Sequence, residues 1–288
     1  MLLKVIILAI VQGLAELLPV SSSAHVVVAE KLLGLDPSSP PMTLLLVMLH
    51  TGTMFAVIAY FWPQWRGTYF QSAAAFRSFA GLAIIATACT AVIGEGIVVI
   101  IERTVFRGVP HAEIEDLFSH LEFIAPALAA AGVLIVIAGI FGNRHPTPGL
   151  SAANDLNAKR AGVIGAIQGL CLPFRGFSRS GATISAGMLL GVAKSRAEAF
   201  SFALAVVLTP PVVAREVLRL LRAARLQGTA DLASVGLLSV LGAVVAFLAG
   251  LLALKWLSRW LEGGRWYLFG IYCVAAAAAV ALLHRAGY

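Results

Sequence analysis

Long runs of apolar residues, separated by short polar segments, make up most of the chain. Five runs are long enough for a helix to cross a bilayer, whose hydrocarbon core takes roughly 20 apolar residues. These runs are Met42–Trp62, Phe79–Ile101, Leu121–Phe141, Leu232–Leu257 and Trp266–Leu283. Because they are continuous and do not alternate with polar residues, they predict helices and not barrel strands. The pattern predicts an all-α integral membrane protein, a multi-spanning helical bundle in which residues 1–288 form a single membrane domain.

Four shorter apolar segments accompany these runs: Leu2–Val20, Ala161–Leu172, Ile184–Val192 and Ala197–Ala214. The first and the last are long enough to cross the bilayer, whereas the other two are too short to do so alone. The first segment is interrupted by Gln12 and Glu16, and no small-residue cleavage site follows it. We therefore expect it to belong to the mature protein and not to be a signal peptide.

Composition and charge support a membrane location and indicate an orientation. Hydrophobic residues make up 60% of the chain and charged residues 12%, against about 25% charged in soluble domains. The net charge of +7 points to loop orientation and anionic lipid, and we expect no nucleic-acid partner. Loops 63–78 and 142–160 are basic and loop 102–120 is acidic. Basic loops stay in the cytoplasm, so 102–120, and with it the region before Met42, is predicted to lie outside.

One pattern of residues occurs twice along the chain. Residues 7–34 and residues 163–191 each contain an apolar helix, a polar serine-rich break and a second short apolar helix, followed by longer apolar stretches. The matching positions at equal spacing are Gln12 and Gln168, Gly13 and Gly169, Leu14 and Leu170, and Ser22 and Ser178. Chance similarity between apolar sequences is the simpler explanation. The alternative is a pair of structural repeats that meet at a shared binding site.

We favour the repeat hypothesis, with repeat one over about residues 1–150 and repeat two over about residues 151–288. If the acidic loop is outside, inverted repeats bring both breaks to the same side. Non-helical backbone at membrane depth survives only when it is buried in protein or lines a wet cavity. The sequence therefore predicts two re-entrant helix–break–helix hairpins that face each other.

The first break carries a carboxylate, hydroxyls and an imidazole within ten residues. Glu16 lies one helical turn after Gln12, Pro19 disfavours helix at the residue before it, and His25 follows Ser21–Ser23. An ionisable residue inside an apolar segment is a functional hypothesis by default. The simpler readings are a solvated carboxylate at the interface, serines that only cap the next helix, and a histidine that anchors it.

The second break is rich in positive charge and hydroxyls. Its polar residues are Arg175, Ser178, Arg179, Ser180 and Thr183, with glycines at 176 and 181. Glycine lets the backbone approach a ligand, and successive N–H groups at a helix N-terminus bind anions. Arginine adds a planar cation suited to phosphate. Anchoring by the positive-inside rule is the simpler alternative for both arginines.

The two breaks complement each other in a way that suits phosphoryl transfer, where catalysis is mostly positioning and charge stabilisation. A serine would act as nucleophile, with His25 as proton shuttle, and Glu16 would bind a divalent cation, either Mg²⁺ or Ca²⁺. His50, inside a predicted span, could border the site, but we expect it to pack in the core. The candidate substrate-binding residues are Gln12, Ser21, Ser178, Ser180, Gly181, Thr183 and Arg175.

At these residues the sequence resembles the undecaprenyl-diphosphatase family, also called the bacitracin-resistance family. That family's first motif is an acid or glutamine, then glutamate, then Pro-Val-Ser-Ser and a histidine. It corresponds here to Gln12, Glu16, residues 19–22 and His25. The second motif, Pro-Gly-x-Ser-Arg-Ser-x-x-Thr, is matched from Gly176 onward, but Phe174 and Arg175 separate Pro173 from that glycine.

The resemblance implies a membrane hydrolase that converts undecaprenyl diphosphate to the monophosphate, recycles the lipid carrier for peptidoglycan synthesis and gives bacitracin resistance. It implies that Glu16 supports metal and diphosphate, with Gln12 as a second metal ligand. Ser22 would be the nucleophile, His25 a proton-transfer group and Arg179 the phosphate clamp. It further implies a bacterial inner-membrane location with the site facing the periplasm, dependence on a divalent cation, and a homodimer. The alternative is a lipid-phosphate transporter or flippase of the same architecture, which needs no nucleophile.

Overall fold

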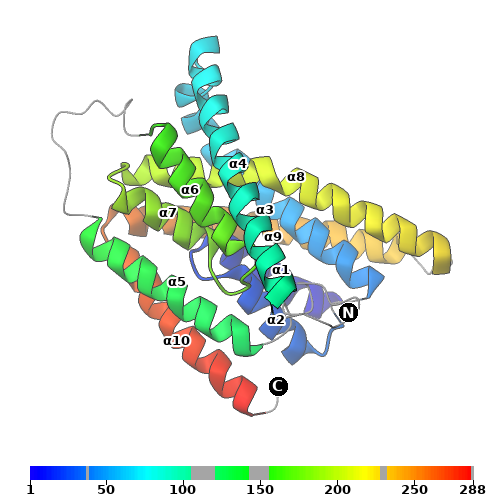
Figure 1. The fold of residues 1–288 in the computed structure, drawn as a ribbon. Helices are drawn as coiled ribbons and strands as arrows, with labels where there is room; N and C mark the ends of the chain where they lie inside the picture. The colour runs from blue at the N-terminus through cyan, green and yellow to red at the C-terminus, as the bar shows by residue number, and fades with distance from the viewer. Residues whose placement is uncertain (37–38, 105–120, 143–155, 228–231, 287–288) are drawn as a thin grey trace.

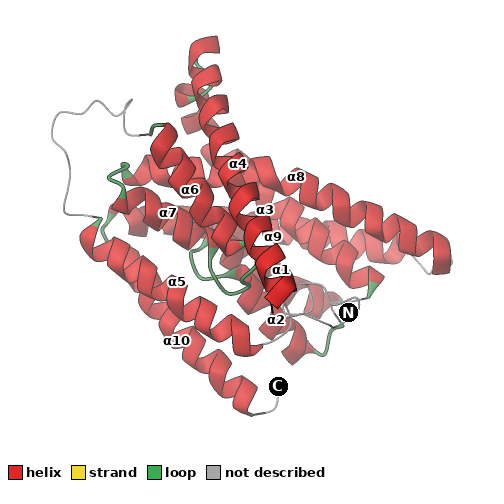
Figure 2. Cartoon of the chain, in the orientation of Figure 1, coloured by secondary structure: helices red, strands yellow, loops and turns green. Residues whose placement is uncertain are grey.

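The computed structural model describes residues 1–36, 39–104, 121–142, 156–227 and 232–286, and the regular secondary structure among them is entirely helical (Figure 2). This confirms the predicted fold class. The helices in the described residues are α1 (Leu2–Leu17), α2 (Ser22–Leu33), α3 (Pro40–Thr68), α4 (Ala73–Thr104), α5 (Leu121–Phe141), α6 (Ala158–Cys171), α7 (Arg179–Leu189), α8 (Lys194–Gln227), α9 (Leu232–Glu262) and α10 (Trp266–Arg285).

Six helices in the described part of the chain are long and apolar enough to cross a membrane. They contain the stretches Pro41–Thr68, Ala73–Thr104, Glu122–Phe141, Lys194–Leu218, Gly236–Glu262 and Trp266–Arg285. Five of these correspond to the five predicted runs. The sixth, in α8, contains the segment Ala197–Ala214. The predicted run Leu2–Val20 gives α1, which ends at Leu17 and is not among the six.

Two short helix pairs carry the predicted breaks. Helix α1 ends at Leu17 because Leu18 is extended (φ −74°, ψ 151°), as expected for the residue before Pro19. Helix α7 begins after Ser178, whose hydroxyl accepts a hydrogen bond from the Gly181 N–H. Each pair, α1 with α2 and α6 with α7, packs together.

The described helices follow the same order twice. Helix, break, short helix and three long helices occur in α1–α5 and again in α6–α10. Helix α4 packs on α6 as α9 packs on α1, and α5 pairs with α10, shown in green and red in Figure 1. This order agrees with the repeated sequence pattern. The inverted relation between the halves and the re-entrant character of the two pairs remain predictions.

Glycine lets several helix pairs approach closely. A Cβ atom at Gly270 would lie 2.5 Å from the carbonyl oxygen of Gly132, and one at Gly132 would lie 2.8 Å from that of Gly270. A Cβ atom at Gly165 of α6 would overlap the Ala86 carbonyl of α4. Small residues at crossings are typical of membrane helix packing, where backbone contact replaces the hydrophobic effect. These contacts fix the helices that surround the two breaks.

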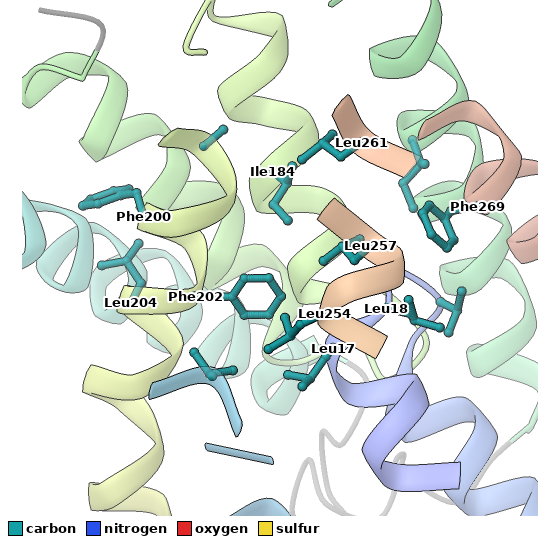
Figure 3. Packing of buried hydrophobic residues seen from close by; sticks show 14 of the residues in the cluster. Leu17, Leu18, Ile184, Phe200, Phe202, Leu204, Leu254, Leu257, Leu261 and Phe269 are labelled. Atoms are coloured by element: carbon teal, nitrogen blue, oxygen red, sulfur yellow. The ribbon is translucent and has the colours of Figure 1, made fainter. Parts of the chain in front are cut away.

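One apolar cluster connects the elements on either side of the breaks (Figure 3). Leu17 and Leu18, at the end of α1, belong to the same buried cluster as Ile184 of α7 and Leu254 and Leu257 of α9. All five side chains are at most 6% exposed. The packing therefore holds the start of the first break and the helix that follows the second break in one rigid unit.

Candidate active site

The first break contains a strained backbone residue. Ser21 occupies the N-cap position of α2 with φ 66° and ψ 92°, and it is the single residue other than glycine with positive φ in the described part of the chain. Its hydroxyl makes no capping bond to the helix and lies 3.2 Å from the Ser23 hydroxyl. Capping therefore does not account for Ser21, and strain of this kind concentrates at functional sites.

Glu16 is the residue at which the two breaks meet. Its Oε2 accepts hydrogen bonds from the Ser22 hydroxyl (2.5 Å) and from Gln12 Nε2 (3.2 Å). Its Oε1 pairs with Arg179 Nη2 at 3.2 Å, across 163 positions of sequence. The Glu16 side chain is 16% exposed. One shielded carboxylate thus contacts a hydroxyl of the first break and a guanidinium of the second.

His50 lies beside this carboxylate and not in the core, so the expectation of core packing is wrong. Its Nδ1 is 2.9 Å from Gln12 Nε2 and 3.7 Å from Glu16 Oε2, and its side chain is 46% exposed. Helix α3 provides it. The signal available in the sequence was an ionisable side chain inside a predicted span, which by itself indicates function.

His25 has two hydrogen-bond partners, and one of them is a residue that the motifs do not indicate. Its Nδ1 lies 2.8 Å from the Ser21 carbonyl oxygen, and its Nε2 lies 2.7 Å from the hydroxyl of Tyr272 in α10. The two rings stack with centroids 5.7 Å apart. Because Tyr272 lies in an ordinary apolar run far along the chain, only the fold reveals this contact.

Arg179 and the loop before it bring the second break to the first. The Gly176 N–H donates to the Ser23 hydroxyl at 3.2 Å. Arg179 binds Glu16 through Nη2, while its Nη1 is buried with no hydrogen-bond partner. A guanidinium with an unsatisfied donor beside a carboxylate and a hydroxyl can donate a hydrogen bond to a phosphate oxygen.

The other residues predicted to bind substrate are mostly engaged within the protein. Ser178 caps α7, receiving the Gly181 N–H, and the buried Ser180 hydroxyl donates to the Leu18 carbonyl at 3.3 Å. The Thr183 hydroxyl contacts the Arg179 carbonyl (2.7 Å) and the Ser201 hydroxyl (2.6 Å). These contacts shape the second break. Arg175 is exposed on the same loop.

The donor set suits a divalent cation only in part. The described residues contain no group of three or more His, Cys, Asp or Glu side chains that could hold a metal. Among the described side chains that contact Ser22 and Arg179, Glu16 offers a carboxylate, and Gln12 beside it can add an amide oxygen. Mg²⁺ is often bound by one or two carboxylates together with substrate phosphates. The residues therefore fit an ion that a diphosphate helps to hold, and not one held by protein alone.

An apolar cavity of about 310 Å³ lies beside the loop of the second break. Its lining is Phe123, Pro126 and Ala127 of α5, Leu170 of α6, and Phe174 and Phe177 of the loop. Phe174 belongs to the apparent insertion in the second motif. Phe177 lies two residues before Arg179 in the chain, so the loop that lines the cavity is the one that leads to Arg179.

The sequence similarity of this chain to known proteins extends over both breaks. The model of the family described as "Bacitracin resistance protein BacA" matches residues 5–279. The chain is 56% identical over 285 residues to undecaprenyl-diphosphatase 2 of Acinetobacter baylyi, with 98% of each chain covered. It is 32% identical over 283 residues to undecaprenyl-diphosphatase of Rhodopirellula baltica, again with 98% of each covered. It is 33% identical over 272 residues to undecaprenyl-diphosphatase of Desulfosudis oleivorans, with 93% of each covered.

Proposed function

The chain belongs to the bacitracin resistance protein BacA family, and from this membership we propose that it hydrolyses undecaprenyl diphosphate to undecaprenyl phosphate and phosphate. The reaction recycles a lipid carrier of peptidoglycan synthesis and gives bacitracin resistance. It takes place in a multi-pass protein of the bacterial inner membrane, in agreement with the six long apolar helices of the described residues. The observation that carries the proposal is the contact of Glu16 with both Ser22 and Arg179.

Ser22 is the proposed nucleophile. Its hydroxyl oxygen attacks the terminal phosphorus of the diphosphate, and the hydroxyl proton passes to Glu16 Oε2, which lies 2.5 Å away. The bond from that phosphorus to the bridging oxygen breaks, and undecaprenyl phosphate leaves with the bonding electrons. Water then attacks the phosphorus of the phosphoserine, and the bond from that phosphorus to the Ser22 oxygen breaks. Glu16 returns to the Ser22 oxygen the proton that it took in the first step, His25 takes up one proton of the water, and inorganic phosphate leaves.

Arg179 is the proposed phosphate clamp. Its buried Nη1 has no partner, and a guanidinium donates to phosphate oxygens with two parallel bonds. The charge that develops on the transferring phosphoryl group is stabilised by such fixed donors. When the phosphate binds, it competes with Glu16 for this cation, and the carboxylate becomes a stronger base for the Ser22 proton.

Three further roles belong to the proposal. His25 acts in proton transfer after the first step, since its own contacts are with Ser21 and Tyr272 while Glu16 holds the Ser22 hydroxyl. A divalent cation, Mg²⁺ or Ca²⁺, would be held by Glu16 and Gln12 together with the diphosphate, and it would neutralise phosphate charge. A homodimer is proposed from the family resemblance alone.

The apolar cavity is proposed to hold the first isoprene units of the lipid. Two of its lining side chains are themselves exposed, Phe123 at 50% and Phe174 at 38%. A lipid chain in the cavity would therefore contact apolar side chains that also face the surroundings of the protein. Among the described residues, the side chains that line the cavity carry no charge, as a hydrocarbon chain requires.

We propose that the site faces the periplasm. The predicted outer loop, residues 102–120, lies for the most part outside the described residues, but α5 begins directly after it. The Gly176 backbone of the second break packs against Ile124 in the first turn of α5. The break and that loop therefore share one end of the helix, which supports an opening toward the outer side.

Phosphate release from a long-chain polyprenyl diphosphate by the purified protein, in detergent with a divalent cation, tests the function. The proposal predicts stoichiometric inorganic phosphate and lipid monophosphate. The alternative, a lipid-phosphate transporter, predicts no phosphate release but movement of labelled lipid phosphate across reconstituted vesicles. Wild-type protein that moves the lipid and releases no phosphate would contradict the proposal.

A further inference from the structure

Two consecutive residues of α10 form hydrogen bonds with the first break, one before and one after its strained residue Ser21. The Cys273 thiol donates to the Pro19 carbonyl at 3.2 Å, and the Tyr272 hydroxyl lies 2.7 Å from His25 Nε2. Ser21, with φ 66°, lies between these two contacts. We propose that Tyr272 is a positioning residue of the reaction, which orients His25 and thereby holds the Ser21–Ser22 turn in its active shape. The inference rests on the proposed function.

The hydrogen-bond chemistry fixes which nitrogen of His25 carries a proton. The Ser21 carbonyl can only accept, so His25 Nδ1, at 2.8 Å, must be the donor. In the neutral ring, Nε2 is then the acceptor, and the Tyr272 hydroxyl donates to it. Tyr272 therefore occupies the one lone pair through which neutral His25 could take up a proton.

A phenol hydroxyl can serve both proton states of the ring. When His25 gains a proton at Nε2, that nitrogen becomes a donor, and the Tyr272 oxygen can accept from it after its own hydrogen rotates away. The contact is thus kept while His25 gains and loses a proton. An apolar residue in place of Tyr272 would leave Nε2 without this partner in either state.

Tyr272 supports His25 through two separate contacts, the stacking of its ring and the hydrogen bond of its hydroxyl. The rings are nearly parallel, with an angle of 14° between their planes, so the face of Tyr272 supports the face of His25. Replacing tyrosine by phenylalanine removes the hydroxyl and keeps this packing. The variant Tyr272→Phe therefore isolates the hydrogen bond from the structural role of the ring.

The hydrogen bond between Tyr272 and His25 also supports the backbone of the turn at Ser21 and Ser22. A residue other than glycine at positive φ persists only when its surroundings hold it. The Ser21 carbonyl is bound by His25, and His25 is bound by Tyr272. Because Ser22 follows Ser21 directly, a change in this turn moves the proposed nucleophile relative to Glu16.

The test compares Tyr272→Phe with Tyr267→Phe, a partly exposed tyrosine of the same helix, by kcat and KM for phosphate release and by thermal unfolding. We expect Tyr272→Phe to lower kcat about tenfold, the size that the loss of one hydrogen bond implies, with KM and Tm unchanged. Tyr267→Phe should match the wild type in all three. In the His25→Ala background, Tyr272→Phe should cause no further loss, because Tyr272 acts through His25.

Three outcomes would overturn the inference: wild-type kcat in Tyr272→Phe, losses that multiply in the double variant, or a Tyr272→Phe protein that does not fold. A wild-type protein with no phosphatase activity is a different result. It would remove the proposed function itself, so the two failures are distinguishable.

Discussion

Glu16 combines more roles than its place in the sequence indicates. An acidic residue in an apolar helix was enough to suggest a functional role, and its spacing from Gln12 was enough to predict that these two side chains share one helix face. The ion pair with Arg179 and the approach of His50 depend on how helices from distant parts of the chain pack. No local pattern encodes these contacts. The kinds of side chain in the site could therefore be predicted from the sequence, whereas the residues that each of them contacts across the fold could not.

The variant Glu16→Gln tests the base. Glutamine has nearly the same shape and can still accept a hydrogen bond from Ser22, but it takes no proton. We expect phosphate release to fall by about 10²–10⁴-fold, the contribution of a positioned general base. Glu95→Gln, which changes an exposed carboxylate of α4 in the same way, should keep wild-type activity. Equal rates for the two variants would exclude Glu16 as the base.

At the scale of elements, the positions of the two breaks could be predicted from the sequence, whereas their backbone conformations could not. Pro19 and the serines locate the end of α1 and the start of α2 within a residue or two. The strained φ of Ser21 and the left-handed φ of +100° at Gly176 reflect the packing of α5 and α10 against the breaks. The inserted Phe174 and Arg175 looked like a disturbed motif. In the fold, Phe174 instead lines a cavity.

Gly176→Ala should impair both stability and activity. The backbone conformation is unfavourable for alanine, and a Cβ atom would lie 2.5 Å from the Ile124 carbonyl, so destabilisation of more than about 1 kcal/mol is expected. Gly96→Ala is the matched control, because a Cβ atom there meets no atom within 4 Å. Thermal unfolding and phosphate release report the two effects. Wild-type behaviour of Gly176→Ala would show that the turn is not required.

Phe174→Ser tests the lipid cavity. Loss of an apolar wall should raise KM for a polyprenyl diphosphate of eleven isoprene units several-fold and leave kcat unchanged, since in the proposed complex this side chain would contact only the lipid tail. A soluble diphosphate with a short alkyl chain should be hydrolysed as by the wild type. Phe55→Ser, a change to an exposed phenylalanine of α3, serves as control. The cavity is not the tail site if KM for both substrates stays at the wild-type value.

For the whole molecule, the five longest spans could be predicted because bilayer thickness sets their length. The sequence left open whether Leu2–Val20 and Ala197–Ala214 also cross, and only the second belongs to one of the six long apolar helices of the described residues. The pairing of helices could not be predicted, because glycines and alanines are spread over every span and mark no particular partner. The α5–α10 pair depends on the contact of Gly132 with Gly270. This pair also carries Tyr272 to His25, so packing at a distance determines the geometry of the first break.

Gly270→Leu should separate α5 from α10. Overpacking at a tight contact costs about 1–3 kcal/mol, so we expect unfolding in detergent at a temperature several degrees lower, together with reduced phosphate release. Gly81→Leu in α4, where a Cβ atom meets no atom within 4 Å, should change neither quantity. An unfolding temperature for Gly270→Leu equal to that of the wild type would contradict the packing described for this pair.

In the proposed reaction, Ser22, which is held by Glu16 and lies opposite Arg179, attacks the terminal phosphate. The most direct test is the initial rate of phosphate release from a polyprenyl diphosphate by Ser22→Ala, beside the wild type and Ser78→Ala, a change to an exposed serine of α4. We expect a loss of at least about 10³-fold for Ser22→Ala, with its fold intact, and wild-type release for Ser78→Ala. Phosphate release by Ser22→Ala at the wild-type rate would show that Ser22 is not the nucleophile.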